Sequence, residues 1–324
     1  MAQTLTLSSP SFQWPRISPM VSALVAVFLA IATLSFASIL IRLSERELGP
    51  FSTIFNRFWM AFVILAIIYT VQGVKPRQPP IITGCDRLLL IMAGVLFWGC
   101  LGFWAWSLTL TGVANSTVLH NLTPLFTTLG AWLLWRESFD RRFLVGLGVA
   151  MIGAIALGIG DFEIGTGHLN GDLAAFFSAI LSAANLMLIE KLRAKFPALI
   201  ILLWCCGVGA ILSLPVVLVT EQRLFPITLG GWLSVAALAL VCQVIGQGLQ
   251  AYSLKHLPSS LVGIFLLLDP VFAGLIAWML FAEGLSLINA LAFGTVLLGM
   301  YLAQSSQYGD RIFQKPCLAG CPET

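Results

Sequence analysis

Residues 122–137 read LTPLFTTLGAWLLWRE, and residues 268–283 read LDPVFAGLIAWMLFAE, in one gapless register 146 residues apart. Both stretches place a proline 13 residues before a glutamate and keep a tryptophan at the same place between them. Further matches in this register are Gly102 with Gly248, Gly148 with Gly294, and Gly153 with Gly299. So many coincidences at one shift indicate an internal duplication, although the beginnings of the two halves match poorly.

The composition predicts a membrane protein. Of the 324 residues, 59% are hydrophobic and 10% are charged, and the mean hydropathy is +0.96. Soluble domains carry roughly 25% charged residues. The apolar runs match the ~20 residues that cross a bilayer as a helix. A net charge of +3 without a continuous basic stripe gives no indication of nucleic-acid binding.

We therefore expect an all-α membrane protein with ten transmembrane helices arranged as two five-helix repeats. The predicted spans are 20–41, 51–72, 88–108, 113–135, 143–160, 171–190, 198–219, 229–251, 258–281 and 286–305. The predicted segments are a flexible tail at 1–19, the first repeat at 20–160, a linker at 161–170, the second repeat at 171–305 and a tail at 306–324. A short organellar targeting segment is the alternative interpretation of the first tail.

Basic residues predict the orientation in the membrane. With both termini in the cytoplasm, 13 of the 17 Lys and Arg residues lie on the cytoplasmic side, three lie opposite, and Arg57 falls within a span. We expect a multi-pass protein of the plasma (inner) membrane. Five spans per repeat is an odd number, so the second repeat enters from the opposite face. Inverted repeats are typical of secondary transporters; the alternative is a duplication with no mechanistic role.

The motif residues resemble the EamA family of the drug/metabolite transporter superfamily. The resemblance is carried by NRFWMA at 56–61, by the two repeated stretches, and by Gly153 and Gly299. It covers roughly residues 22–305 and implies inverted five-helix repeats that export small metabolites. The seventh span lacks an arginine corresponding to Arg57. The substrate does not carry over, because substrates in the family are diverse.

Two ionisable groups lie deep in predicted spans, where such groups usually face a cavity or a partner. Arg57, which follows Asn56, suits a carboxylate or another anion because guanidinium donates two parallel hydrogen bonds. The alternative for Arg57 is a packing role. Asp269 precedes Pro270, whose ring bends a helix and frees a carbonyl. Asp269 suits a coupling proton, a cation or a pairing with Arg57, or it donates to that carbonyl when protonated.

Polar stripes at helical spacing complete the predicted site. His120 and Asn121 share a face of the fourth span with Pro124, and Gln243 and Gln247 share a face of the eighth. For each stripe the alternative is hydrogen bonding between helices. Trp106 belongs to an aromatic cage or to an interfacial belt. The candidate substrate-binding residues are Asn56, Arg57, Trp106, His120, Asn121, Gln243, Gln247 and Asp269; Pro124 and Pro270 are candidate bends, and Glu137 and Glu283 are candidate structural residues at span ends.

The sequence argues against an enzyme. It contains no H-E-x-x-H, P-loop or G-x-S-x-G string, and we expect no cofactor and no metal. The leading prediction is export of an amino acid or a similar polar or amphiphilic compound by alternating access, with proton exchange as one form of coupling. A channel, or a membrane scaffold or sensor, is the alternative. The expected partners are the small-molecule substrate and the lipid bilayer, with a homodimer through the fifth and tenth spans as a further option.

Overall fold

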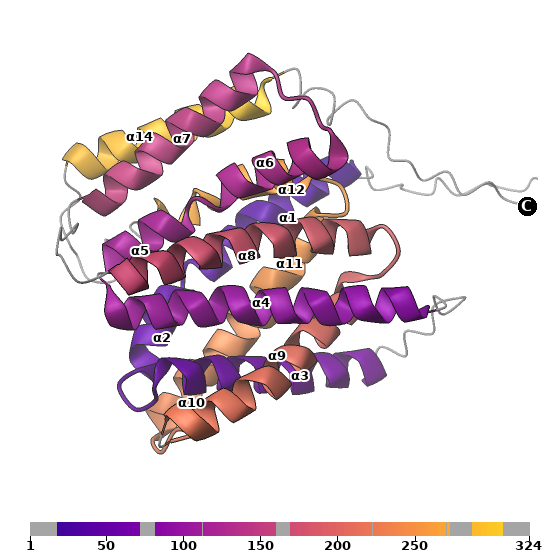
Figure 1. Ribbon diagram of the computed structural model, residues 1–324, viewed down its shortest axis with the longest axis vertical. Helices are drawn as coiled ribbons and strands as arrows, with labels where there is room; N and C mark the ends of the chain where they lie inside the picture. Colours follow the sequence, from indigo (N-terminus) through magenta and orange to yellow (C-terminus); the bar gives the residue numbers. More distant parts are fainter. Residues whose placement is uncertain are drawn as a thin grey trace, which may run out of the picture.

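The computed structural model describes residues 18–71, 82–111, 113–159, 169–221, 223–269, 271–272 and 287–306. Every regular element in these ranges is a helix (Figure 1). Six helical segments are long and apolar enough to cross a membrane, and they coincide with predicted spans one to three and six to eight. They are Pro19–Ile41, Pro50–Val71, Gly84–Leu110, Leu169–Arg193, Ala198–Thr220 and Leu229–Ser253. The all-helical membrane class is confirmed.

Six of the ten predicted spans are therefore candidate membrane spans by length and composition. Of the other four, the fourth is interrupted, the fifth and tenth are single helices of 19 and 18 residues, and part of the ninth lies outside the described residues. In chain order, the helices are α1 (Pro19–Leu34), α2 (Ala37–Ser44), α3 (Pro50–Val71), α4 (Gly84–Leu110), α5 (Val113–His120), α6 (Thr123–Trp135), α7 (Arg141–Ile159), α8 (Leu169–Arg193), α9 (Ala198–Thr220), α10 (Leu229–Ala237), η1 (Leu238–Gly246), α11 (Gln247–Ser253), α12 (Ser259–Leu266) and α14 (Leu287–Gln304).

The fourth predicted span breaks where proline enters it. Pro124 is near the start of α6 and has no backbone N–H, and its ring clashes with the carbonyl four residues earlier. That carbonyl, on His120, accepts a hydrogen bond from Thr123 Oγ1 at 2.7 Å instead. In the second repeat α12 ends at Leu266, just before Asp269. Pro270 lies outside the described residues.

Two further interruptions were not predicted. The first span bends between α1 and α2 at Ser35, whose hydroxyl donates to the carbonyl of Ile31 at 2.9 Å, a contact that often bends helices. The eighth span changes into a π-helix, η1, between α10 and α11. Such bulges are frequent at functional sites. Each repeat therefore contains irregular backbone in the middle of its helices.

Helices α7 and α14 lie together along one edge of the bundle (Figure 1). Their contact is made by backbone. A Cβ added to Gly299 would lie 2.2 Å from the nitrogen of Ala150, and one added to Gly153 would lie 2.7 Å from the nitrogen of Val296. These two contacts exchange partners at the 146-residue shift, since 150 corresponds to 296 and 153 to 299. The small residues therefore join one repeat to the other.

The remaining helices pack around a shared core. Helix α4 packs on α8 and α9, while η1 and α11 pack on α1, and η1 packs on α3. Phe58 and Phe97, whose rings meet edge to face with centroids 5.5 Å apart, belong to this core. Each of these helix pairs joins a helix of the first repeat to one of the second, whereas the ring contact of Phe58 with Phe97 lies between α3 and α4 of the first repeat. The repeats are interleaved, and neither forms a separate domain.

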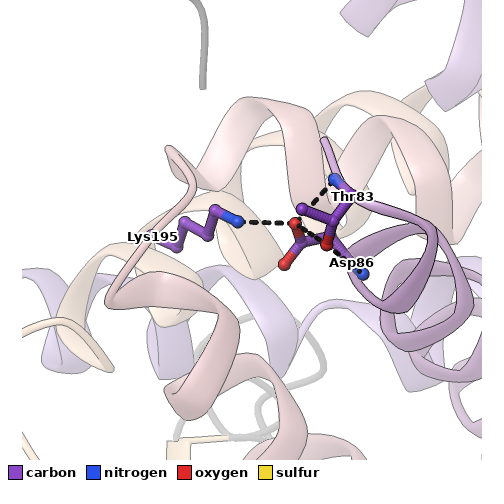
Figure 2. Close-up of polar contacts among 3 residues, drawn as sticks. All are labelled: Thr83, Asp86 and Lys195. Atoms are coloured by element: carbon purple, nitrogen blue, oxygen red, sulfur yellow. Dashed lines mark hydrogen bonds and ion pairs between the residues drawn. The ribbon is translucent and has the colours of Figure 1, made fainter. Parts of the chain in front are cut away.

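Polar contacts join the repeats at both ends of the bundle. At the end where α4 begins, Lys195 Nζ lies 2.5 Å from Asp86 Oδ2, and Asp86 also forms a capping box with Thr83 (Figure 2). At the other end, Glu221 accepts hydrogen bonds from the backbone of Phe51 at 2.7 Å and of Ser52 at 3.0 Å. There Glu47 also accepts from Thr228. Contacts of this kind join the two repeats at both ends of the bundle.

Candidate functional site

A cavity of about 150 Å³ lies among helices of both repeats. Its walls come from α1, α3, α4, α8 and α11 and from the broken regions around α5, α6 and α12. The lining is mixed: leucine, isoleucine, phenylalanine and cysteine side chains alternate with polar ones. The polar lining residues are Arg57, Trp104, His120, Asn121, Thr123, Ser182, Asn185, Gln247, Gln250 and Asp269. Five of the eight predicted substrate-binding residues are in this list.

Arg57 is the cation of the cavity wall. Helix α3 buries it to 3% exposure, and its Nε donates to Gln243 Oε1 at 2.7 Å. Gln243 is fully buried in η1, and its own amide nitrogen lies 3.6 Å from Cys206 Sγ. This contact fixes the plane of the guanidinium. Within the described residues, the terminal nitrogens have no protein partner, so they remain free for a ligand.

Asp269 is the carboxylate of the cavity wall. Its Oδ1 lies 2.5 Å from Ser35 Oγ, and its backbone oxygen lies 3.2 Å from the same hydroxyl. The single hydrogen of this hydroxyl is shared among these two oxygens and the carbonyl of Ile31. Ser35 marks the bend between α1 and α2, and Asp269 follows the end of α12. The two interruptions therefore meet at one point. Sequence reasoning missed Ser35, although a polar residue in the middle of an apolar span is the signal that could have revealed it.

His120 ends α5 and is held by α8. Its Nδ1 lies 2.7 Å from Ser178 Oγ, and that hydroxyl also lies 2.8 Å from the carbonyl of Ala175. When the hydroxyl donates to Ala175, Nδ1 donates to Ser178 and Nε2 is the acceptor of the neutral ring; when it donates to Nδ1, the roles of the two ring nitrogens are reversed. The ring also lies beside that of Trp104, with centroids 5.7 Å apart.

Two cavity residues carry buried donors without a protein partner. Trp104 Nε1 and Asn121 Nδ2 are both enclosed, and neither has a hydrogen bond within the part of the chain that the structure describes. Sequence reasoning singled out Trp106 instead of Trp104. Trp106 lies two residues further along α4 and is 41% exposed on the outside of the bundle. Helical spacing defines a face, but it does not determine which face turns inward.

Several predicted residues lie outside the cavity lining. Asn56 is fully buried but donates to the carbonyls of Ser52 at 2.8 Å and Leu224 at 2.7 Å. Gln243 lies behind Arg57. Glu137 follows the end of α6, where Arg136 adopts a left-handed conformation with φ of 52°. Glu283 lies outside the described residues.

A second, smaller pocket adjoins the cavity. It has a volume of about 10 Å³, and it shares Arg57, Leu101 and Trp104 with the central cavity. Its remaining wall includes Glu45, which follows the end of α2, and Pro50, the first residue of α3. The three shared residues therefore separate the central cavity from the end of the bundle where α3 begins.

Comparisons with known proteins agree with this geometry. The model of the EamA-like transporter family matches residues 21–159 and 169–304. An uncharacterized transporter of Archaeoglobus fulgidus is 25% identical over 87% of this chain and 98% of its own length. The S-adenosylmethionine uptake transporter of Rickettsia prowazekii is 24% identical over 58% of this chain and 61% of its own length.

The fold is also found among solved structures. One crystal structure has a TM-score of 0.76 and 21% identity, and the match covers 90% of this chain and 99% of that one. The family model matches the chain twice and leaves only short segments unmatched. This double match identifies the duplication in the sequence as a duplicated family domain. The chain is a multi-pass membrane protein and belongs to the EamA-like transporter family.

Proposed function

We propose that the protein is a secondary transporter that exports an amino acid or a similar small polar metabolite by alternating access. The observation that carries this proposal is the central cavity, whose described lining includes a cation, Arg57, and a carboxylate, Asp269, in walls built from both repeats. A zwitterion offers the complementary pair of charges. Lining amides such as Gln247 supply neutral hydrogen bonds that orient a polar solute.

The proposed architecture is ten spans in two inverted five-helix repeats. The support is the reciprocal contact of Gly153 with Val296 and of Gly299 with Ala150, which a two-fold relation between the repeats would produce. Both termini of the proposed plasma-membrane protein lie in the cytoplasm, and the excess of Lys and Arg on one side supports this orientation. Reporter tags in the 72–81 and 136–140 connections should both lie in the cytoplasm. Two tags on opposite sides of the membrane would contradict the inverted arrangement.

Transport requires the cavity to open to each side in turn. Interruptions at Ser35, at Pro124 and before Asp269 give the lining helices places to bend without loss of long regular segments. Asp269 supplies a group for proton coupling. A rate that does not change with pH would remove proton coupling and leave the rest of the proposal intact.

Flux into proteoliposomes tests the function. The purified protein should move a labelled amino acid with saturation, and Arg57→Ala and Asp269→Asn should each lower the flux at least tenfold. Trp106→Phe is the matched control, because its side chain lies on the outside of the bundle. Unsaturable flux at ion-channel rates would favour a channel. Net movement of the labelled compound toward the cytoplasmic side would show uptake instead of export. Uptake is the activity named for the Rickettsia relative.

A further inference from the structure

We propose that Trp104, Asn121 and the first turn of α6 form, together with Arg57, a carboxylate-binding corner of the central cavity. The substrate must then carry a carboxylate. This inference rests on the proposed transport function and names the substrate class of the same cavity. We call these four elements the donor corner.

The first observation is the pair of unsatisfied donors. In native structures buried polar groups almost always have partners, and each exception calls for an explanation. Four enclosed side-chain atoms in the described ranges have none, and Trp104 Nε1 and Asn121 Nδ2 are the two that belong to the cavity lining. Both are N–H donors. Two unsatisfied donors in one cavity fit a ligand that brings acceptor oxygens.

The second observation is the start of α6. This 13-residue helix begins at Thr123 inside the cavity wall, and Leu122 before it provides no side-chain cap. The N-terminus of a helix carries partial positive charge, which favours anions. Pro124 has no N–H, and the N–H groups of Leu125 and Phe126 donate to the carbonyl of Leu122. The backbone N–H of Thr123 is therefore the donor that this turn can offer an anion.

The third observation is the position of Arg57. Arg57 and Trp104 line both the central cavity and the smaller pocket, so they lie on the same wall between them. Gln243 occupies the Nε of Arg57 and leaves the terminal nitrogens, which suit a carboxylate. Asn121 and Thr123 belong to the same cavity. The corner therefore combines a fixed cation, two neutral donors and a helix N-terminus.

The opposite charge lies elsewhere in the lining. Helix α12 ends at Leu266, and its C-terminus and the carboxylate of Asp269 both favour a cation. A substrate with a carboxylate and an ammonium group would satisfy both regions. The two regions can be tested separately, because one of the two charged groups can be removed from the ligand at a time.

Four compounds with one side chain isolate the two groups. L-leucine carries both charges, L-leucinamide and isopentylamine lack the carboxylate, and isocaproate lacks the ammonium. Their Kd values are measured by thermal stabilisation of the purified full-length protein in detergent. The wild-type protein should bind L-leucine and isocaproate at least tenfold more tightly than isopentylamine, as expected for a ligand that gains charge-assisted hydrogen bonds.

Variants then assign the effect to the donor corner. Trp104→Phe keeps a ring and removes the N–H, and Asn121→Leu keeps the shape and removes the amide. Each variant should raise the Kd of isocaproate and of L-leucine by about tenfold and leave the Kd of isopentylamine unchanged. Trp106→Phe makes the same change on the exposed side of α4 and should change none of the Kd values. Equal Kd values for all four compounds would overturn the proposal. Wild-type Kd values for isocaproate and L-leucine in Trp104→Phe would overturn it as well.

Stability without ligand is a second readout that needs no substrate. Asn121→Leu removes a donor that has no partner and keeps the size of the side chain, so the variant should melt no lower than the wild type. A clear fall in the Tm of this variant would show that the Asn121 amide N–H has a structural partner, which contradicts the donor corner. Flux separates this proposal from the transport function. Carboxylate binding without flux would contradict transport alone, whereas saturable flux of a compound without a carboxylate would contradict the donor corner alone.

Discussion

The two repeats meet in two different ways, and the difference separates structure from function. Along α7 and α14, small residues bring backbone against backbone, so that a Cβ added to Gly146 would lie 2.4 Å from the nitrogen of Ala303. In the centre, the helices are interrupted and hold a cavity with buried polar groups. The contact of α7 with α14 leaves no room for a ligand, whereas the central helices surround a cavity.

Packing explains the contrast. Without a hydrophobic driving force between helices in lipid, small residues gain stability by close approach, and any added atom must displace backbone. Interrupted helices around a cavity make fewer close packing contacts, but they present polar groups that a solute can reach. We therefore expect substitutions at the α7–α14 contact to change stability most and substitutions at the cavity to change transport most.

The largest effect is expected from Gly299→Ala. The new Cβ would lie 2.2 Å from the backbone nitrogen of Ala150, so the helices must separate, at a cost of about 3 kcal/mol, the upper part of the usual range for overpacking. Thermal unfolding in detergent measures the loss. Gly294→Ala is the matched control on the same helix, since its Cβ meets nothing within 4 Å. Equal Tm values for the two variants would show that α7 and α14 do not touch in this way.

A smaller loss of stability is expected from Gln243→Leu. This change leaves the Nε of the buried Arg57 without its acceptor, which costs about 2 kcal/mol. Gln243→Glu instead supplies an acceptor and a compensating charge, so it should preserve Tm more than Gln243→Leu does while weakening carboxylate ligands. Measurements of Tm and isocaproate Kd on both variants separate the two effects. A Gln243→Leu protein as stable as the wild type would contradict the importance of this contact.

The contact between Asp86 and Lys195 should contribute less. The Lys195 side chain is 44% exposed, and ion pairs in contact with water are worth about 0.5 kcal/mol and weaken in salt. A double-mutant cycle of Lys195→Met and Asp86→Asn, in low and high salt, measures the coupling. Asp86 also belongs to the capping box of α4, so its single variant should cost more than that of Lys195. Coupling that is independent of salt would contradict an ion pair.

The smallest effect should come from Glu47, at the opposite end of the bundle. Hydrogen bonds from the side chain and then the backbone of Thr228, and from the backbone of Ile227, hold the pKa of Glu47 below its ordinary value of 4.5. The unfolded chain thus takes up the proton at a higher pH than the folded one. The contribution of Glu47 to stability is present above pH 4.5 and is lost as the pH falls through the lowered pKa.

Glu47→Gln should therefore flatten the fall in Tm in the acid range below pH 4.5. Thr228→Val removes the hydrogen bond from the Thr228 hydroxyl to Glu47 and should flatten the fall in Tm over the same pH range. Tm measured from neutral to acid pH provides the comparison. An unchanged pH profile in both variants would show that this contact adds nothing to the joining of the repeats.

The sequence predicted the larger features because they rest on local rules. Runs of apolar residues must become helices in lipid, so the helical spans follow from the chain alone. Pro124 was a candidate bend because proline removes a backbone donor, but α9 continues through Pro215, so the break at Pro124 also depends on its surroundings. The duplication was visible as matching residues. Arg57 and Asp269 were identified because a charge in an apolar span needs a partner or a cavity.

The details of the cavity required the tertiary structure. Two tryptophans lie close together on α4, and only the packing of the helix on its neighbours turns Trp104 inward and Trp106 outward. Ser35 contacts Asp269 across 234 positions of the chain, and Gln243 contacts Arg57 across 186. Composition and periodicity decide what each segment becomes, because those preferences are local. Which side chains meet depends on how the segments rotate against one another, and that is decided by packing over the whole molecule.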